Sequence, residues 1–229
     1  MTRLIPGFGH LPKIEKMPNG VEMSSDQVAF VNDLDMSRRI TEFGERFVSF
    51  FGGSGIDKGS YYYEKAVELA QTISLSGCAL LTGGGSGIME AGNRGANLSS
   101  SGSSYGILTN TIQHEFSSAN PFIDTDKKFT FNTLSVRLLT LISNSRAVVF
   151  FPGGFGTFEE LFSLLVREKV EMMKPLPIYL FGSAFWNGLV AWLKDVVVKE
   201  GVIGAEHLEL FRVEDDSTKI ADEIIGYCS

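Results

Sequence analysis

Three glycine-rich turns constrain the fold of this chain most strongly. Each follows an apolar run of strand length and precedes a segment whose apolar residues recur at helical spacing. The turns occupy residues 52–55, 83–87 and 152–157. Strand, glycine turn and helix in this order are typical of a parallel sheet, where all such turns lie at the carboxyl edge of the strands. We therefore expect the three turns to converge on one ligand site.

The alternation of strands and helices continues along most of the chain. Strands are predicted at 47–51, 78–82, 105–108, 147–151, 177–181 and 208–213, and helices at 61–76, 88–98, 134–143, 157–173, 185–199 and 217–227. This pattern predicts an α/β fold, a Rossmann-like doubly wound parallel sheet with helices on both faces, in a single domain over residues 46–229. A long irregular segment at 109–133 is expected to act as a lid or binding loop.

Residues 1–45 are predicted to form an N-terminal arm followed by a helical extension. Prolines and glycines without a clear period fill the first 26 residues, and apolar residues at helical spacing follow from residue 27 to residue 46. The extension would cover the domain's own core or bind a partner.

Composition narrows the function classes. The net charge of −7 disfavours nucleic-acid binding, which needs a basic face to neutralise phosphates. Cys78 and Cys228 are the only cysteines, so no disulfide framework is implied. Neither a leader peptide nor an apolar run of membrane-spanning length is apparent, and we expect a soluble cytoplasmic protein with no membrane partner.

The turn at 152–157 has the features of an anion site. Backbone N–H groups at a helix N-terminus are unpaired, and glycines let a phosphate approach them closely. Glu159 and Glu160 follow in what we expect to be the first helical turn, where the helix dipole favours their ionised forms. Thr157 and Glu160 also have the spacing of a capping box, so the stretch has a purely structural interpretation as well, and the two interpretations are compatible.

Other nucleotide and metal motifs are absent from the sequence. Gly85-x-Gly87-x-x-Glu90 carries glutamate where a dinucleotide fingerprint needs its third glycine, and no P-loop motif occurs. The histidines and cysteines lack metal-ligand spacing, so no metal is expected. Of the three histidines only His114, in the long loop, is a candidate for substrate contact.

Two long motifs resemble those of a known family. Residues 152–160 read Pro-Gly-Gly-Phe-Gly-Thr-Phe-Glu-Glu, which is similar to the signature PGGxGTxxE, and residues 82–96 resemble its partner motif TGGGPGIMEAANxGA. The chain thus resembles the Lonely Guy (LOG) phosphoribohydrolases, formerly called lysine decarboxylase-like, from about residue 47 to residue 224. The resemblance implies a Rossmann-like homodimer that cleaves nucleoside 5′-monophosphates, such as cytokinin riboside or AMP-like nucleotides, to free base and ribose 5-phosphate. It implies no cofactor, pyridoxal phosphate included.

The resemblance also assigns the site. Glu160 corresponds to the last glutamate of the signature, and the family's catalytic arginine corresponds to Arg137, which is otherwise interpreted as an arginine extending from a packed helix to solvent. The expected substrate-binding residues are Gly153, Gly154, Gly156, Thr157, Glu159, Gly84, Gly85, Gly87, Met89, Glu90 and Ser54. Glu160 would stabilise the oxocarbenium-like charge on ribose or activate water, while Arg137 would stabilise the leaving base or position the substrate.

Three positions depart from the family pattern. Leu138 stands where close members have lysine, Ile56 where many have arginine, and Ser86 where proline is common. The missing basic residues leave two alternatives to this hydrolysis: non-catalytic binding of a nucleotide or phosphate ester on the same fold, or another phosphoribosyl-directed reaction.

Overall fold

The computed structural model describes residues 14–16, 22–110 and 119–228. Within them, seven parallel strands form one sheet in the order β6-β5-β4-β3-β7-β8-β9, so the Rossmann-like fold is confirmed. The strands are β3 (Phe47–Phe51), β4 (Ala79–Thr82), β5 (Ser104–Thr109), β6 (Lys128–Phe131), β7 (Ser145–Phe150), β8 (Ile178–Phe181) and β9 (Arg212–Glu214). A separate antiparallel pair joins β1 (Ile14–Lys16) to β2 (Glu22–Ser24).

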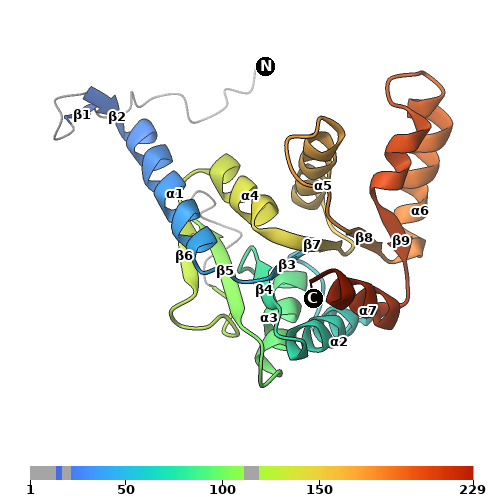
Figure 1. The fold of residues 1–229 in the computed structure, drawn as a ribbon, viewed down its shortest axis with the longest axis horizontal. Helices are drawn as coiled ribbons and strands as arrows, with labels where there is room; N and C mark the ends of the chain where they lie inside the picture. The colour runs from blue at the N-terminus through green and yellow to red at the C-terminus, as the bar shows by residue number, and fades with distance from the viewer. Residues whose placement is uncertain (1–13, 17–21, 111–118, 229) are drawn as a thin grey trace, which may run out of the picture.

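Helices cover both faces of the sheet (Figure 1). They are α1 (Ser25–Glu42), α2 (Tyr61–Leu75), α3 (Ile88–Asn97), α4 (Leu134–Ser143), α5 (Phe155–Lys169), α6 (Ser183–Trp192) and α7 (Ser217–Cys228). A π-helical segment, Leu193–Val198, extends α6, and a 3-10 segment, Ala205–Leu210, precedes β9. Helices α1, α4, α5 and α6 contribute to one core, and α2, α3 and α7 contribute to the other.

The central strands read as continuous apolar runs because the sheet is buried on both sides. Every residue of β3 is buried. Phe47 and Phe51 belong to the core under α4 and α5, whereas Val48 and Phe50 belong to the core under α2 and α3. Successive side chains of one strand therefore hold the two helical layers together.

Two edge strands differ from the prediction. The segment 109–133 was expected to be irregular, but Lys128–Phe131 forms β6, a four-residue edge strand that pairs with β5. The strand expected at 208–213 lies later, as β9, because the first half of that stretch belongs to the 3-10 segment. Short strands at sheet edges carry a weak hydrophobic pattern, since only one neighbour fixes them.

Helix α1 packs against the domain along α4 (Figure 1). Its Ile40 joins the core, and its Asp33 is completely buried. The Asp33 carboxylate accepts hydrogen bonds from the backbone N–H of Asn132 (3.0 Å) and Thr133 (2.7 Å), just before α4 begins. Phe30 and Leu34 of the same helix are nearly half exposed, so α1 covers the core and also presents apolar side chains at the surface.

No helix of the described ranges combines the length and hydrophobicity that a membrane span requires.

Candidate functional site

The three glycine turns meet, as predicted, because β4, β3 and β7 are neighbours in the sheet. Direct hydrogen bonds join them. The N–H of Gly53 donates to the carbonyl of Pro152 (2.9 Å), and the N–H of Ile88 donates to the carbonyl of Gly53 (3.2 Å). The Ser86 hydroxyl donates to the carbonyl of Ser54 (2.9 Å). The turns therefore form one continuous backbone surface.

Glycine is required where one turn touches another. Gly87 has a φ of +64°, and a Cβ there would clash with the carbonyl of Gly53. A Cβ on Gly153 would clash with the Thr157 hydroxyl and lie 2.9 Å from the Gly53 nitrogen. These two glycines permit the close approach of the turns, so they support the site without lining its cavity.

The turns surround a cavity of about 400 Å³ between the ends of β3 and β7. The chain winds from β3 toward β6 in one direction and from β7 toward β9 in the other, so this is the point where the strand order reverses. Open α/β sheets bind ligands in the crevice at that point. The cavity is lined by Phe51, Gly52, Gly53, Ser54, Gly83, Met89, Leu134, Arg137, Leu138, Gly154, Phe155, Gly156, Thr157, Glu159 and Glu160.

The N-terminus of α5 forms the anion-binding part of this cavity. The helix begins at Phe155, and its first backbone bond runs from the Phe158 N–H to the Gly154 carbonyl (3.0 Å). The N–H groups of Phe155, Gly156 and Thr157 find no acceptor in the described part of the chain. Unpaired N–H groups and the positive end of the helix dipole together favour a phosphate.

The capping-box interpretation is wrong. Thr157 is the third residue of α5 and not its cap, and the cap residue Gly154 has no side chain that accepts a hydrogen bond. The helix begins two residues earlier than predicted. Glu159 and Glu160 consequently lie in its second turn, where the helix dipole no longer acts strongly on them.

Glu160 has the most perturbed carboxyl group of the site. Burial raises its pKa to about 8, the positive charge of Arg137 opposes that shift, and the negative charge of Glu159 adds to it. The expectation that the dipole favours an ionised Glu160 was therefore wrong, since desolvation dominates. A carboxyl group with a pKa near neutral pH in a cavity is characteristic of an acid or base in catalysis.

Arg137 is anchored inside the protein instead of extending to solvent. Its Nε donates to the carbonyl of Ile107 (2.8 Å), and its Nη2 donates to the carbonyl of Gly83 (3.1 Å). Burial lowers the pKa of Arg137, and the charge of Glu160 opposes that shift. The carbonyls of Ile107 and Gly83 thus fix the guanidinium at the cavity wall. Its remaining N–H groups can contact a ligand in the cavity.

The predicted binding residues fall into two sets. Those that line the cavity are Ser54, Met89, Gly154, Gly156, Thr157 and Glu159. Those that lie outside its lining are Gly84, Gly85, Gly87, Glu90 and Gly153. Glu90 faces away between α2 and α3, where it pairs with the Lys58 ammonium (2.7 Å) and accepts from the Tyr63 hydroxyl (3.1 Å). His114 lies outside the described residues.

The sequence prediction missed the apolar wall of the cavity. Phe155 is 95% exposed at the tip of the third turn, and Leu134 and Leu138 from α4 face the same space. An aromatic residue between two glycines at the start of a helix is poorly placed for any core, and that signal was available in the sequence. Leu134 and Leu138 gave no signal of a position in the cavity wall, because they follow the helical pattern of core residues.

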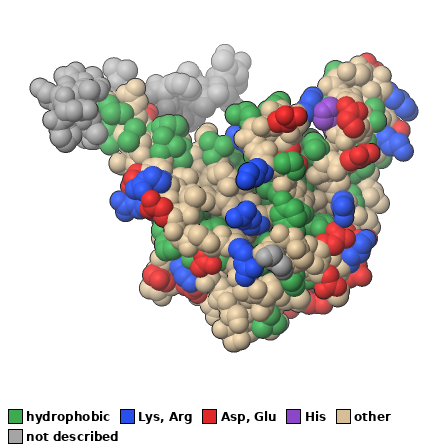
Figure 2. All heavy atoms as spheres, viewed as in Figure 1, with side chains coloured by type: hydrophobic (Ala, Val, Ile, Leu, Met, Phe, Trp, Pro, Cys, Tyr) green, Lys and Arg blue, Asp and Glu red, His purple; other side chains and the backbone are tan. Residues whose placement is uncertain are grey.

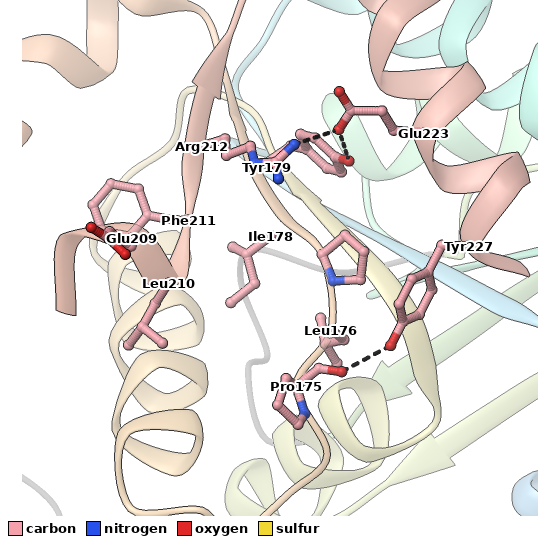
Figure 3. Close-up of a pocket in the computed structure, with 11 residues that line it drawn as sticks. Pro175, Leu176, Ile178, Tyr179, Glu209, Leu210, Phe211, Arg212, Glu223 and Tyr227 are labelled. Atoms are coloured by element: carbon pink, nitrogen blue, oxygen red, sulfur yellow. Dashed lines mark hydrogen bonds and ion pairs between the residues drawn. The ribbon is translucent and has the colours of Figure 1, made fainter. Parts of the chain in front are cut away.

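A second cavity, of about 450 Å³, lies at the opposite, amino edge of β8 and β9 (Figure 3). Its polar side chains bond to one another. Glu223 accepts from the Tyr179 hydroxyl (2.6 Å) and from Arg212 (2.8 Å), and the Tyr227 hydroxyl donates to the Pro175 carbonyl (2.9 Å). Because these four side chains are already paired, and only Glu209 of the polar lining lacks a partner among the residues that the structure describes, this cavity is a weaker candidate than the one at the glycine turns.

The fold and the cavity define a Rossmann-like α/β protein with an anion-binding helix terminus at the switch point of its sheet. Comparison with known families agrees. A family model described as "possible lysine decarboxylase" matches residues 89–224, more than half of the chain. The chain belongs to this family, the LOG family.

Individual relatives are distant. The probable cytokinin riboside 5′-monophosphate phosphoribohydrolase LOGL9 of Oryza sativa subsp. japonica is 25% identical over 231 residues, which span 97% of this chain and 96% of that protein. The molybdenum cofactor binding protein of Rippkaea orientalis has a TM-score of 0.57 at 20% identity, with coverage of 81% of this chain and 98% of that chain. The molybdenum cofactor carrier protein of Chlamydomonas reinhardtii has a TM-score of 0.53 at 18% identity, covering 80% and 99%. These two structures support the fold.

Proposed function

We propose that this protein hydrolyses the N-glycosidic bond of a nucleoside 5′-monophosphate, releasing the free base and ribose 5-phosphate. The observation that carries the proposal is the meeting of Glu160, Arg137 and the unpaired N–H groups of α5 in one cavity. Family membership and the name of the rice relative support the same reaction.

In the proposed complex, the 5′-phosphate binds the N–H groups of Phe155, Gly156 and Thr157. Phosphate at that position directs the ribose toward Glu160, one helical turn further along α5. The base then lies against the apolar wall, where Phe155 offers a ring for stacking. Glu159, which is exposed beside Glu160, is placed to accept hydrogen bonds from ribose hydroxyls.

The chemical step needs a carboxylate and a cation. As the C1′–N bond breaks, its electron pair leaves with the base and positive charge develops on ribose, which ionised Glu160 stabilises. A water oxygen bonds to C1′ and gives a proton to Glu160, whose raised pKa suits it to accept one. Arg137 stabilises the negative charge on the departing base but is a poor proton donor, so the base receives the proton held by Glu160, relayed through a water molecule, and Glu160 returns to its ionised form.

The second candidate is a non-catalytic binder of a nucleotide or phosphate ester. Among the described residues that line the cavity, Arg137 is the only basic one, and two backbone carbonyls already accept hydrogen bonds from part of its guanidinium. The fold neighbours named as molybdenum cofactor binding and carrier proteins make binding without hydrolysis a concrete alternative.

One assay separates the two candidates. The protein is incubated with AMP, GMP, CMP, UMP and IMP, and free base and ribose 5-phosphate are measured alongside the ligand-induced shift of the melting temperature. We expect base release with at least one nucleotide, and a loss of about 10²- to 10⁴-fold in Glu160→Gln. Thermal stabilisation without any base release would establish the binder. Glu159→Gln, an equal change at the exposed neighbour, is the matched control and should retain far more activity.

We also propose that the protein acts as a homodimer. Figure 2 shows several hydrophobic patches on the face that carries α1 and α4. On these two helices Phe30, Leu34 and Leu134 are each more than two fifths exposed. Exposed apolar side chains on neighbouring helices are typical of an interaction site. Sedimentation of the wild-type protein should give twice the chain mass, and Leu34→Glu should shift the mass toward one chain. A monomeric wild type across the micromolar range would contradict the proposal.

A further inference from the structure

The two cysteines lie together although they are far apart in sequence. Cys78 immediately precedes β4, and Cys228 is the last residue of α7. They belong to the same core cluster and are 1% and 6% exposed. Each thiol is the main influence on the pKa of the other, as expected of neighbouring sulfurs. Both are free thiols in this structure.

The surrounding bonds hold this pair in position from two sides. Arg46 donates from Nη1 to the carbonyl of Cys228 (2.9 Å) and from Nη2 to the carbonyl of Ser76 (3.5 Å), so one guanidinium ties the end of α7 to the turn before Cys78. The Tyr227 hydroxyl donates to the Pro175 carbonyl (2.9 Å), as Figure 3 shows. These bonds place the last turn of α7 beside the turn that precedes Cys78.

The pair is also chemically asymmetric. Cys228 and the Ser76 hydroxyl, which lies 3.5 Å from the Cys78 sulfur, act with the charge of Arg46 to lower the pKa of Cys78 to about 6. The same contact with Cys78, together with burial, raises the pKa of Cys228. A thiolate facing a thiol is the arrangement in which one sulfur attacks an oxidant and the other resolves the product.

We propose that Cys78 and Cys228 are a peroxide-sensitive pair that forms a reversible disulfide and fastens α7 to the start of β4. The Cys78 thiolate attacks one oxygen of hydrogen peroxide, so that an S–O bond forms, the O–O bond breaks, and the hydroxide released takes a proton to become water. Cys228 then loses its proton and attacks the Cys78 sulfur. The S–S bond forms, the S–O bond breaks, and a second water leaves. Peroxide is reduced while two thiols are oxidised.

Access to the buried thiols follows from their place at the end of a helix. The last turn of α7 contains exposed Gly226 and Tyr227, and helix ends open locally at small free-energy cost. Cys228, the more exposed of the two thiols, lies on that turn. A small oxidant such as peroxide reaches the pair when the turn opens, and a thiol-reactive reducing agent reverses the reaction by the same route.

The test uses the full chain and both oxidation states. The reduced protein is treated with hydrogen peroxide, the remaining thiols are alkylated, and tryptic peptides are mapped by mass spectrometry. We expect a Cys78–Cys228 linked peptide, loss of both free thiols, recovery of both with dithiothreitol, and a rise of about 10 °C in melting temperature from closure of a loop of about 150 residues.

Two variants serve as controls. In Cys228→Ser, Cys78 should be trapped as a sulfenic acid by dimedone, and peroxide should no longer raise the melting temperature. Cys78→Ser should leave Cys228 unreactive. The proposal is overturned if the wild type forms only disulfides between chains, or if both thiols stay unmodified at peroxide concentrations that oxidise an exposed cysteine.

Discussion

Replacing Glu160 by glutamine should stabilise the fold while removing activity. Glutamine has nearly the same shape and cannot ionise, so the substitution removes only the energetic penalty of a buried carboxylate. In the folded protein the pKa of Glu160 is raised to about 8 from an ordinary value of 4.5. A carboxyl group that is harder to ionise in the folded state makes folding less favourable wherever the unfolded chain is ionised.

The size of this effect follows from the pKa difference. Below pH 4.5 Glu160 is protonated in both states and contributes nothing. Between pH 4.5 and pH 8 the penalty grows by about 1.4 kcal/mol per pH unit, and above pH 8 it levels off at about 5 kcal/mol. Because part of Glu160 stays exposed, water screens its charge, and we expect about half of that figure, roughly 2 to 3 kcal/mol.

Urea unfolding at pH 5 and pH 9 measures the difference. The free energy of unfolding of Glu160→Gln should exceed that of the wild type by less than about 1 kcal/mol at pH 5 and by at least 2 kcal/mol at pH 9. Glu159→Gln, at the exposed neighbour, should change stability by no more than about 0.5 kcal/mol at either pH. Equal stabilisation by Glu160→Gln at both pH values would refute the assignment of a buried, hard-to-ionise carboxyl group.

Four further predictions concern other parts of the molecule. If ionised Glu160 is required, kcat/KM of the proposed hydrolysis should rise with pH and level off above about 8, and a flat profile from pH 6 to 9 would count against that role. Gly83→Ala would place a Cβ against the guanidinium of Arg137, so kcat/KM should fall about 100-fold with an unchanged circular dichroism spectrum. Glu171, just beyond α5, has a φ of 55°, and Glu171→Gly should raise the free energy of unfolding by about 1 kcal/mol in urea titrations. Asp33→Ala removes the buried carboxylate that accepts from the N–H groups of Asn132 and Thr133, and should lower the free energy of unfolding by about 3 kcal/mol in the same assay.

The sheet and the convergence of its turns were predictable because their signals are local. Apolar runs that end in glycine specify buried parallel strands, and the helix over residues 134–143 was predicted with the observed bounds. The start of α5 was not, because Thr157 imitates a cap and Phe155 carries no capping signal. The helix begins at Phe155, after the turn that follows β7, and Gly153 packs closely against Thr157 in its first turn.

The sequence predicted that Glu160 and Arg137 meet at one site, but it did not predict their energetics or which other motif residues line the cavity. Glu160 and Arg137 were identified from motif positions, and α5 and α4 bring both to the cavity wall. The raised pKa of Glu160 depends on how much protein surrounds its carboxyl group, which spacing does not encode. Likewise Glu90 belongs to a conspicuous motif but does not line the cavity. Its side chain pairs with Lys58 between two helices, because the packing of α2 determines where that side chain points.

The hydrogen-bonded contact between β3 and β7 also affects when the site can exist during folding. Phe51 and Phe150 are partners in that pairing although about 100 residues separate them. Contacts of such long sequence separation form slowly, because closing the intervening loop has an entropic cost before any contact repays it. A nascent chain therefore cannot assemble the cavity until α5 has been synthesised and β7 has inserted beside β3. Ligand binding should then select completely folded molecules, and a nucleotide present during refolding should stabilise the final state without accelerating the early steps.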